Sequence, residues 1–351
     1  MTDFLLYGAY GYTGKLITER AAAYGLRPTL AGRNEAKLRA LSEASGFPYR
    51  TVDLADRSAL EAVLRDFSVV LHAAGPFSQT AEPMLNACLA TNTHYLDITG
   101  EIDVFARAQS MDEAFRSANL MAMPGVGFDV VPTDCIAAFC HAHLPDATDL
   151  TLAFAWKGGG ISHGTAKTML EGLGQPGKVR RNGKITDVPG AYRTATFPFT
   201  ADKDLQAVTI PWGDVFTAYH TTGIPNILTY FAVPPAQIRM MKLGNYLGPL
   251  LRLAPVKNFL RRRVEARPAG PDADRRESAE SYVYGRVTNA AGQSFAARLR
   301  TIEGYTLTAV TALLITRRVL SGDWQAGYRT PAGCYGADFV LEVEGTVREV
   351  V

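Results

Sequence analysis

Residues 4–14 have the sequence Phe-Leu-Leu-Tyr-Gly-Ala-Tyr-Gly-Tyr-Thr-Gly, an apolar run followed by a turn with three glycines. The apolar run predicts a buried strand, and residues 15–24 predict a helix directly after the turn. A strand, a glycine turn and a helix in this order open a dinucleotide-binding fold. Gly8 permits the tight turn, Gly11 lets the backbone approach a pyrophosphate, and Gly14 lets the helix pack against the strand. The helix N-terminus then offers N–H groups to the phosphates. The alternative is a glycine turn in an α/β domain that binds nothing.

The end of the second expected strand, residues 28–31, indicates which dinucleotide is bound. An NAD site usually has a carboxylate here that holds the ribose 2′-OH, whereas an arginine accommodates a 2′-phosphate. The chain has Arg33 at this place and Lys37 one turn further on. A guanidinium suits bidentate binding of phosphate, so the sequence favours NADP over NAD. In the alternative interpretation Asn34 caps the next helix and Arg33 is simply solvated.

Length and composition limit the class of protein. The chain has 351 residues, 47% hydrophobic and 20% charged, which is typical of a globular protein with two domains. A formal net charge of +2 gives no case for a nucleic-acid partner. No CxxC pair occurs among the four cysteines, so we expect neither a disulfide framework nor a metal site. We expect no leader peptide and no membrane span, which favours a cytoplasmic location.

Strand and helix patterns alternate through the first third of the chain. Strands are expected at residues 4–7, 28–31, 49–52, 68–74, 94–97 and 120–123. Six strands with intervening helices predict a parallel, doubly wound Rossmann sheet, whose ligand binds at the carboxyl ends of the strands. The residues expected to bind the cofactor lie at these ends: Gly8, Tyr10, Gly11, Tyr12, Thr13, Gly14, Arg33, Asn34, Lys37, Asp53, Ala74, Gly75, Pro76 and Phe77.

The pattern changes after Phe128. Strand-like and glycine-rich segments follow, with an expected hairpin between residues 281–287 and 294–301 and a long apolar helix at 306–321. They predict a second, α+β domain on a mostly antiparallel sheet. A last helix is expected to begin at Pro331 and to pack on the first domain. The predicted division is therefore 1–128 plus 331–351 for the dinucleotide-binding domain and 129–330 for a substrate or oligomerisation domain.

A set of motifs in a fixed order gives the chain a family resemblance. They lie at residues 7–14, 31–33, 75–77, 95–101, 127–134 and 330–332. With these motifs the chain resembles the saccharopine dehydrogenase-like family, which includes the trans-acting enoyl reductases. The resemblance implies an NADP-binding Rossmann domain interrupted by a substrate domain, and it leaves the reaction open.

Candidates for catalysis lie in two places. Asp97 and Glu101 flank the end of the fifth expected strand, where either could donate a proton or order the loop. Glu101 could equally be a favourable charge in the first turn of a helix. His163 and Lys167 follow three consecutive glycines and are capable acids, the alternative being a flexible strand-to-helix loop. Asp134, a short way after Asp129, is expected to belong to a helix start.

Residues 237–263 interleave methionines and leucines with arginines and lysines. Such a segment can lie on an anionic membrane, cover an apolar substrate, form an oligomer contact or be ordinary core helices.

The first hypothesis is an NADP-dependent oxidoreductase that reduces a C=C or C=O bond of an apolar small molecule, with an acyl chain as one candidate. The alternatives are reduction of an imine between an amino acid and a keto acid, and a dinucleotide-binding scaffold without turnover. A homodimer and peripheral membrane contact are further expectations.

Overall fold

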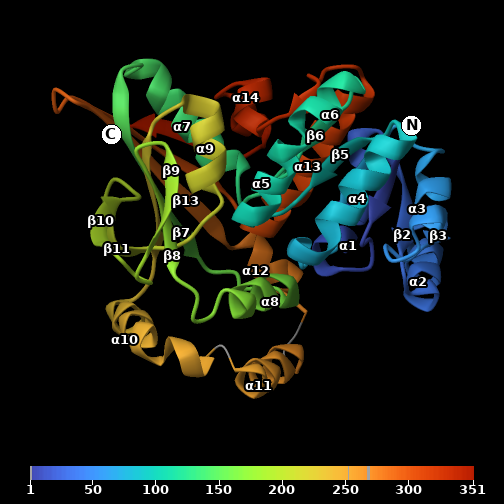
Figure 1. Cartoon of the computed structure of the whole chain (residues 1–351), viewed down its shortest axis with the longest axis horizontal. Coiled ribbons are helices and arrows are strands. Elements are labelled where there is room, and N and C mark those ends of the chain that lie inside the picture. The colour runs from blue at the N-terminus through green and yellow to red at the C-terminus, as the bar shows by residue number, and fades with distance from the viewer. Residues whose placement is uncertain (1, 252, 267–268) are drawn as a thin grey trace. The chain divides into compact units, whose positions relative to one another are not determined.

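The computed structural model describes residues 2–251, 253–266 and 269–351 (Figure 1). The chain divides into two compact units. One contains the residues up to Val131 together with Tyr305–Cys334, and the other contains Pro132–Gly304 together with Tyr335–Val351.

The first unit is built on a parallel sheet of seven described strands in the order β15-β6-β5-β4-β1-β2-β3. They are β1 (Thr2–Tyr7), β2 (Leu26–Gly32), β3 (Tyr49–Thr51), β4 (Val69–His72), β5 (His94–Asp97), β6 (Met121–Met123) and β15 (Gly327–Tyr328). The six expected strands are confirmed, and β15 was not expected. The apolar run of β1 is fully buried because a parallel sheet has helices on both faces.

The strand order places a topological switch point beside β1. From β1 the chain runs outward through β2 and β3, and it then returns to build β4, β5 and β6 on the other side of β1. Ligands of such sheets bind outside the carboxyl ends of the strands at this point. The glycine turn follows β1 and the Ala74–Phe77 segment follows β4, so both lie at the switch point.

Helices connect the strands of the first unit. They are α1 (Tyr12–Arg20), α2 (Glu35–Ser45), α3 (Arg57–Leu64), α4 (Phe77–Thr91), α5 (Ile102–Ser110), α6 (Asp112–Ser117), α13 (Gly304–Leu320) and α14 (Pro331–Tyr335), with a 3₁₀ turn at Ala21–Tyr24. The expected cap of α2 is confirmed, because the Asn34 side chain accepts a hydrogen bond of 3.0 Å from the Lys37 N–H.

Helix α13 belongs to the first unit, which corrects the predicted boundary at residue 330. The loop after β6 packs on this helix: the Phe128 N–H donates to Thr308 Oγ1 at 2.9 Å, and Thr311 Oγ1 donates to the Val126 carbonyl at 2.8 Å. A Cβ at Gly127 would lie 2.6 Å from Thr308 Cγ2, so a glycine is needed for this close packing. The apolar pattern of residues 306–321 predicts a buried helix, but it does not indicate which of the two units the helix belongs to.

The second unit contains a mixed sheet of nine described strands whose main path is β10-β11-β12-β7-β13-β14-β16. They are β7 (Ala147–Lys157), β8 (Gly177–Arg181), β9 (Lys184–Val188), β10 (Thr194–Pro198), β11 (Asp204–Thr209), β12 (Asn226–Ala232), β13 (Glu280–Asn289), β14 (Ser294–Ile302) and β16 (Val347–Val350). Most neighbours are antiparallel, whereas β7 and β12 are parallel. The expected hairpin is confirmed as β13 and β14.

The helices of the second unit are α7 (Val131–His143), α8 (His163–Glu171), α9 (Asp214–Thr222), α10 (Pro235–Leu251), α11 (Ala254–Glu265) and α12 (Ala273–Glu277), with a 3₁₀ turn at Phe339–Glu342. Helix α7 packs on the sheet closely enough that a Cβ at Gly285 of β13 would lie 3.1 Å from Ile136 Cγ2. Among the described residues, no helix has the length and apolar character needed to cross a membrane.

The C-terminal segment corrects the second half of the predicted division. Residues 335–351 belong to the second unit and not to the dinucleotide-binding domain, because β16 pairs antiparallel with β14. The Arg348 guanidinium also lies 3.6 Å from the ring centroid of Phe139 in α7. Pairing with β16 covers backbone groups that the edge of β14 would otherwise expose.

Candidate cofactor site

The glycine turn after β1 is shaped by close backbone contacts. Gly8 has a φ of +87°, and a Cβ there would lie 2.7 Å from the Ala74 nitrogen, in the segment after β4. A Cβ at Gly14 would collide with the Gly8 carbonyl oxygen. The Gly11 N–H donates to the Gly8 carbonyl at 2.9 Å and closes the turn. The tight turn at Gly8 and the close packing of the helix at Gly14 therefore both need glycine, as the sequence predicted.

The N-terminus of α1 suits an anion. Gly11 is the N-cap residue, and it supplies no side-chain capping bond. No acidic residue stands in the first turn, which contains Tyr12, Thr13 and Gly14. The N–H groups and the dipole of this turn favour a negative charge. The geometry thus fits a pyrophosphate at the place where the sequence predicted one.

The end of β2 carries two cations beside an aromatic ring. Tyr10 packs on Gly32, where a Cβ would lie 2.7 Å from Tyr10 Cε1. The Lys37 Nζ lies 5.7 Å from the centroid of the Tyr10 ring, and both Arg33 and Lys37 are exposed. Asn34 serves as the cap of α2, so its side chain has a structural use. The two interpretations of this segment therefore coexist: a capped helix start, and two cations free to meet a phosphate.

Asp53 lies just beyond β3, the strand next to this segment. It follows β3, and the Val52 N–H donates to the Gly32 carbonyl at 3.0 Å. The Asp53 carboxylate accepts a hydrogen bond of 3.0 Å from the Ala55 N–H, which orders its own turn. Burial, and then the charge of Asp53, raise the pKa of Tyr7 to about 12, so the phenol stays protonated. Asp53 is therefore placed at the same edge of the sheet as Arg33.

Glu101 holds the segment after β4 in place through two hydrogen bonds. The Glu101 carboxylate accepts hydrogen bonds from the Phe77 N–H at 3.0 Å and the Ser78 N–H at 2.7 Å, which are the first N–H groups of α4. The N-cap residue of α4 is Pro76, which makes no side-chain capping bond. Glu101 therefore supplies the cap from a distant part of the chain. This geometry favours the loop-ordering interpretation of Glu101.

Asp97 is enclosed at the end of β5. Its carboxylate accepts hydrogen bonds from the Tyr95 hydroxyl at 2.6 Å, the Thr99 N–H at 2.9 Å and the Gly125 N–H at 2.9 Å. The side chain has no exposed surface, and burial raises its pKa to about 7. Because these bonds join the loops after β5 and β6, the geometry favours a loop-ordering role for Asp97 also.

A third carboxyl group lies against the same loop. Asp129 packs on Gly100, where a Cβ would lie 2.7 Å from Asp129 Oδ2. Burial, and then the charge of Glu101, raise the pKa of Asp129 to about 7. Unlike Asp97, Asp129 is only partly buried. Sequence reasoning noticed this residue but did not place it at the cofactor edge, because the spacing gives no sign that residue 129 returns to residue 100.

His72 at the end of β4 was missed by sequence reasoning. It is fully buried, its Nε2 lies 3.0 Å from Thr80 Oγ1, and burial lowers its pKa to about 3. The neutral ring packs 5.3 Å from the Phe77 ring and 5.5 Å from the Tyr7 ring. An apolar strand gives no signal of such a role, and we assign His72 to supporting Phe77.

His163 and Lys167 belong to the second unit, whereas the other candidates belong to the first. His163 begins α8, whose cap is Ser162, and its backbone N–H donates to the Ala269 carbonyl at 2.9 Å. Lys167 follows one turn later. Asp134 lies in the first turn of α7 and accepts a hydrogen bond of 2.5 Å from Thr221 Oγ1, which confirms its expected place at a helix start.

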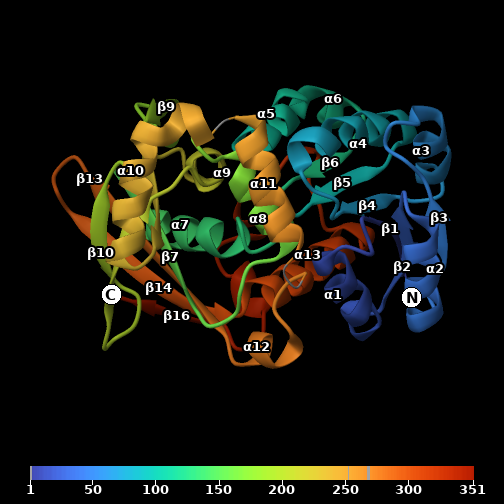
Figure 2. The ribbon, with the colours of Figure 1, turned by 90° about the horizontal axis from the view of Figure 1, so that it is seen from below.

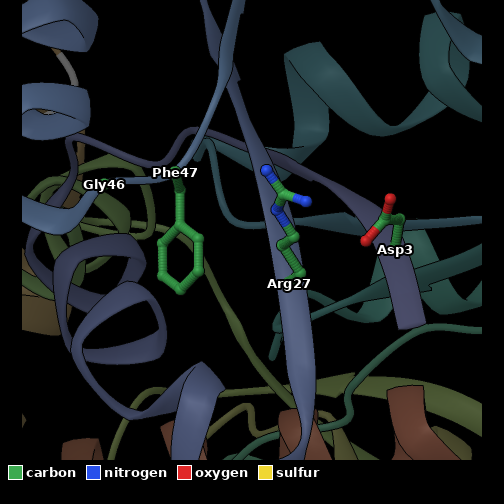
Figure 3. Close-up of a pocket in the computed structure, with 4 residues that line it drawn as sticks. All are labelled: Asp3, Arg27, Gly46 and Phe47. Atoms are coloured by element: carbon green, nitrogen blue, oxygen red, sulfur yellow. The ribbon is translucent and has the colours of Figure 1, made fainter. Parts of the chain in front are cut away.

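A surface depression of about 440 Å³ lies at the opposite edge of the first sheet. Figure 3 shows its lining residues, with Asp3 and Arg27 at neighbouring positions of the adjacent strands β1 and β2, and Phe47 on the other side of Arg27. It lies at the amino ends of β1 and β2, where parallel sheets do not bind their ligands. In the described part of the chain, no group of three or more histidine, cysteine or acidic side chains is arranged to hold a metal ion.

Part of the first unit matches a known family model. Residues 4–123 match the model described as the saccharopine dehydrogenase NADP-binding domain. The saccharopine dehydrogenase-like resemblance is thereby confirmed, and the family's cofactor, NADP, agrees with the preference expected from Arg33.

Curated relatives extend the similarity beyond this domain. A Mycobacterium leprae protein named trans-acting enoyl reductase is 31% identical over 225 residues, which are 58% of this chain and 50% of the relative. A Mycobacterium tuberculosis protein provisionally given the same name is 35% identical over 190 residues, 49% of this chain and 44% of the relative. These matches span half or less of the length of either relative.

A solved structure shares the whole fold. Apo saccharopine dehydrogenase (L-Glu forming) from Saccharomyces cerevisiae matches over 100% of both chains with a TM-score of 0.70 and 14% sequence identity. At this identity the match shows the fold alone. It confirms the predicted fold class, a Rossmann domain with a second α+β domain.

Proposed function

We propose that this protein is an NADPH-dependent reductase that transfers a hydride to a C=C or C=O bond of an apolar small molecule. The observation that carries the proposal is the edge of the first sheet. There the uncapped start of α1 suits the pyrophosphate of NADPH, and the exposed Arg33 and Lys37 suit its 2′-phosphate. The names of the mycobacterial relatives favour a C=C bond in an enoyl group.

We expect different residues at this edge to bind different parts of the cofactor. The first turn of α1 would hold the pyrophosphate, and Arg33 with Lys37 would hold the 2′-phosphate. The segment from Ala74 to Phe77 would line the nicotinamide ribose. NADPH, when bound, supplies the hydride. Glu101 orders this segment by capping α4, and the neutral ring of His72 supports Phe77 from within the sheet.

We assign the role of proton donor to Asp129. Reduction needs a proton donor at the acceptor atom, and a carboxyl group with a pKa near 7 can hold a proton at neutral pH. Asp129 combines a pKa of about 7 with partial exposure, whereas Asp97 has a similar pKa but no exposed surface. Of the two carboxyl groups, Asp129 is the one that a substrate could reach.

A substrate panel tests the proposal. Purified protein is mixed with NADPH and, in separate assays, with an α,β-unsaturated thioester, a ketone, and an amine together with a keto acid, while absorbance reports NADPH oxidation. We expect turnover with the unsaturated thioester. Turnover only with the amine and keto acid would assign imine reduction instead. Tight binding of NADPH without turnover on any arm would indicate a dinucleotide-binding scaffold.

The remaining expectations also stand as proposals. We propose an apolar substrate. We also propose that the protein has no nucleic-acid partner, in line with its formal net charge of +2. A cytoplasmic location and a homodimer rest on the sequence reasoning alone.

A further inference from the structure

Helix α10 exposes an apolar stripe. Met240, Leu243 and Tyr246 are 67%, 58% and 85% exposed. Residues spaced by three lie on the same side of a helix, so these side chains form one continuous stripe. Large apolar side chains gathered on a surface mark an interaction site more often than isolated ones do.

The opposite side of α10 is anchored to the second unit. Ile238 is 4% exposed and packs with Ala191 and Val208. The Asn245 side chain donates to the Gly190 carbonyl at 2.8 Å. Ile238 and Asn245 are seven residues apart and therefore share a face. The helix is thus seated by one face, and its apolar stripe points away from the unit that holds it.

Helix α11 adds a second exposed set. Phe259 is 57% exposed and Leu253, at the N-cap, is 50% exposed. The Arg263 guanidinium lies 5.1 Å from the centroid of the Phe259 ring. Helix α11 packs on α8, on which Met169 is 52% exposed. Figures 1 and 2 both show α10 and α11 as consecutive helices along one edge of this unit, with α8 beside α11.

The charge of α10 and α11 is predominantly positive, since the one acidic residue in their sequence is Glu265, the last residue of α11. No aspartate or glutamate occurs from Val215 to Val264. The same two helices carry basic side chains, of which all but the partly buried Lys257 are exposed: Arg239, Lys242, Lys257, Arg261, Arg262 and Arg263. Arg252, also part of the predicted basic segment, lies outside the described residues. The surface is therefore apolar and cationic at once.

The combination of apolar and cationic side chains indicates what binds to this surface. Two copies related by a two-fold axis through this surface would bring the same cations face to face, which disfavours a symmetric dimer formed by α10 and α11. A bilayer with anionic headgroups accepts both features, since apolar side chains enter the acyl boundary while arginine and lysine stay at the headgroups. A tyrosine as exposed as Tyr246 suits the same boundary. We propose that α10 and α11 dock this protein on anionic membranes, lying in the plane of the interface. The proposal does not depend on the reductase activity.

Vesicle co-sedimentation with the full chain tests the docking surface. The probes are vesicles of phosphatidylcholine alone and of phosphatidylcholine mixed with phosphatidylglycerol. We expect binding to the mixed vesicles that weakens as salt is added, and at least about tenfold weaker binding to the neutral ones. Equal binding to both, or binding to neither, would overturn the proposal.

Apolar variants locate the contact. Leu243→Ser and Phe259→Ser should each weaken binding to the mixed vesicles by about tenfold or more, because each removes an inserted side chain. The matched control is Leu341→Ser, since Leu341 is 37% exposed on a 3₁₀ turn of the same unit. Equal loss in the control, or no loss in the two variants, would contradict the assignment. Unchanged NADPH affinity and circular dichroism show that each variant is folded.

Charge variants separate the membrane from a second copy. Arg262→Glu together with Arg263→Glu should abolish binding to mixed vesicles, whereas Lys203→Glu, an exposed control outside these helices, should not. Analytical ultracentrifugation without lipid gives the competing outcome. A dimer that Leu243→Ser dissociates would assign the surface to a second copy and refute the membrane proposal.

Discussion

Replacing Glu101 with alanine tests how the segment after β4 is held in place. The substitution removes the carboxylate that accepts from the Phe77 and Ser78 N–H groups at 3.0 and 2.7 Å. The first turn of α4 then loses its cap, because Pro76 supplies none. The segment that is proposed to line the nicotinamide ribose loses its anchor at the same time.

The magnitude follows from the two interactions that are lost. Loss of a helix cap costs about 0.5–2 kcal/mol, and loss of a negative charge at a helix N-terminus costs about 0.3–1 kcal/mol. We therefore expect Glu101→Ala to lower the free energy of unfolding by about 1–3 kcal/mol. Glu101→Gln keeps an acceptor oxygen but not the charge, so it should lose roughly half as much.

Urea unfolding at pH 7 measures these losses, and titration with NADPH gives a second result. Glu82→Ala is the matched control, because Glu82 lies on the same helix α4 but only pairs with Arg107 on the surface. This exposed pair should contribute less than about 1 kcal/mol. A loss in Glu101→Ala no larger than in Glu82→Ala would refute the capping account. Unchanged NADPH affinity despite a large loss of stability would separate the segment from the cofactor.

The other predictions concern the phosphate sites and the proton. Arg33→Asp should remove most of the preference for NADPH over NADH, roughly tenfold or more, since a charged hydrogen bond contributes about 1.5–3 kcal/mol; fluorescence titration of both cofactors checks this. Gly11→Val should abolish NADPH binding in a folded protein, whereas Gly14→Val should unfold the turn because a Cβ there collides with Gly8; circular dichroism distinguishes the two. Because the pKa of Asp129 is raised to about 7, its proton is present below this pH and lost above it. Turnover should therefore fall as pH rises through about 7. Asp129→Asn should lower the turnover rate by about 10²-fold or more, and this fall with rising pH should disappear from its pH–rate profile. A variant whose pH–rate profile is the same as that of the unmodified protein would exclude Asp129 as the proton donor.

The local features of the first unit were predictable because neighbouring residues encode them. The strand, the glycine turn and α1 form one contiguous signal, and Asn34 caps α2 through a residue only three positions away. The hairpin of β13 and β14 is likewise local, since its two strands are joined by a short turn. In each case the information lies within one element or between adjacent ones.

Features that depend on distant contacts were not predictable from one sequence. Helix α13 joins the first unit through Thr308 and its bond to Phe128, which lies 180 residues earlier. Strand β16 joins the second unit by pairing with β14, and nothing in its four residues, Val-Arg-Glu-Val, indicates that partner. Sequence reasoning likewise left open whether Glu101 donates a proton, orders the loop or is a charge in the first turn of a helix. Its bonds to the start of α4 depend on residues 23 and 24 positions earlier in the chain.

A crystal structure of the protein with bound NADPH would show where each part of the cofactor lies. We expect the pyrophosphate at the first turn of α1, the 2′-phosphate within hydrogen-bond distance of Arg33 or Lys37, and the nicotinamide ribose beside the Ala74–Phe77 segment. A cofactor bound elsewhere, for example in the depression between Arg27 and Phe47, or one whose 2′-phosphate touches neither cation, would contradict the account.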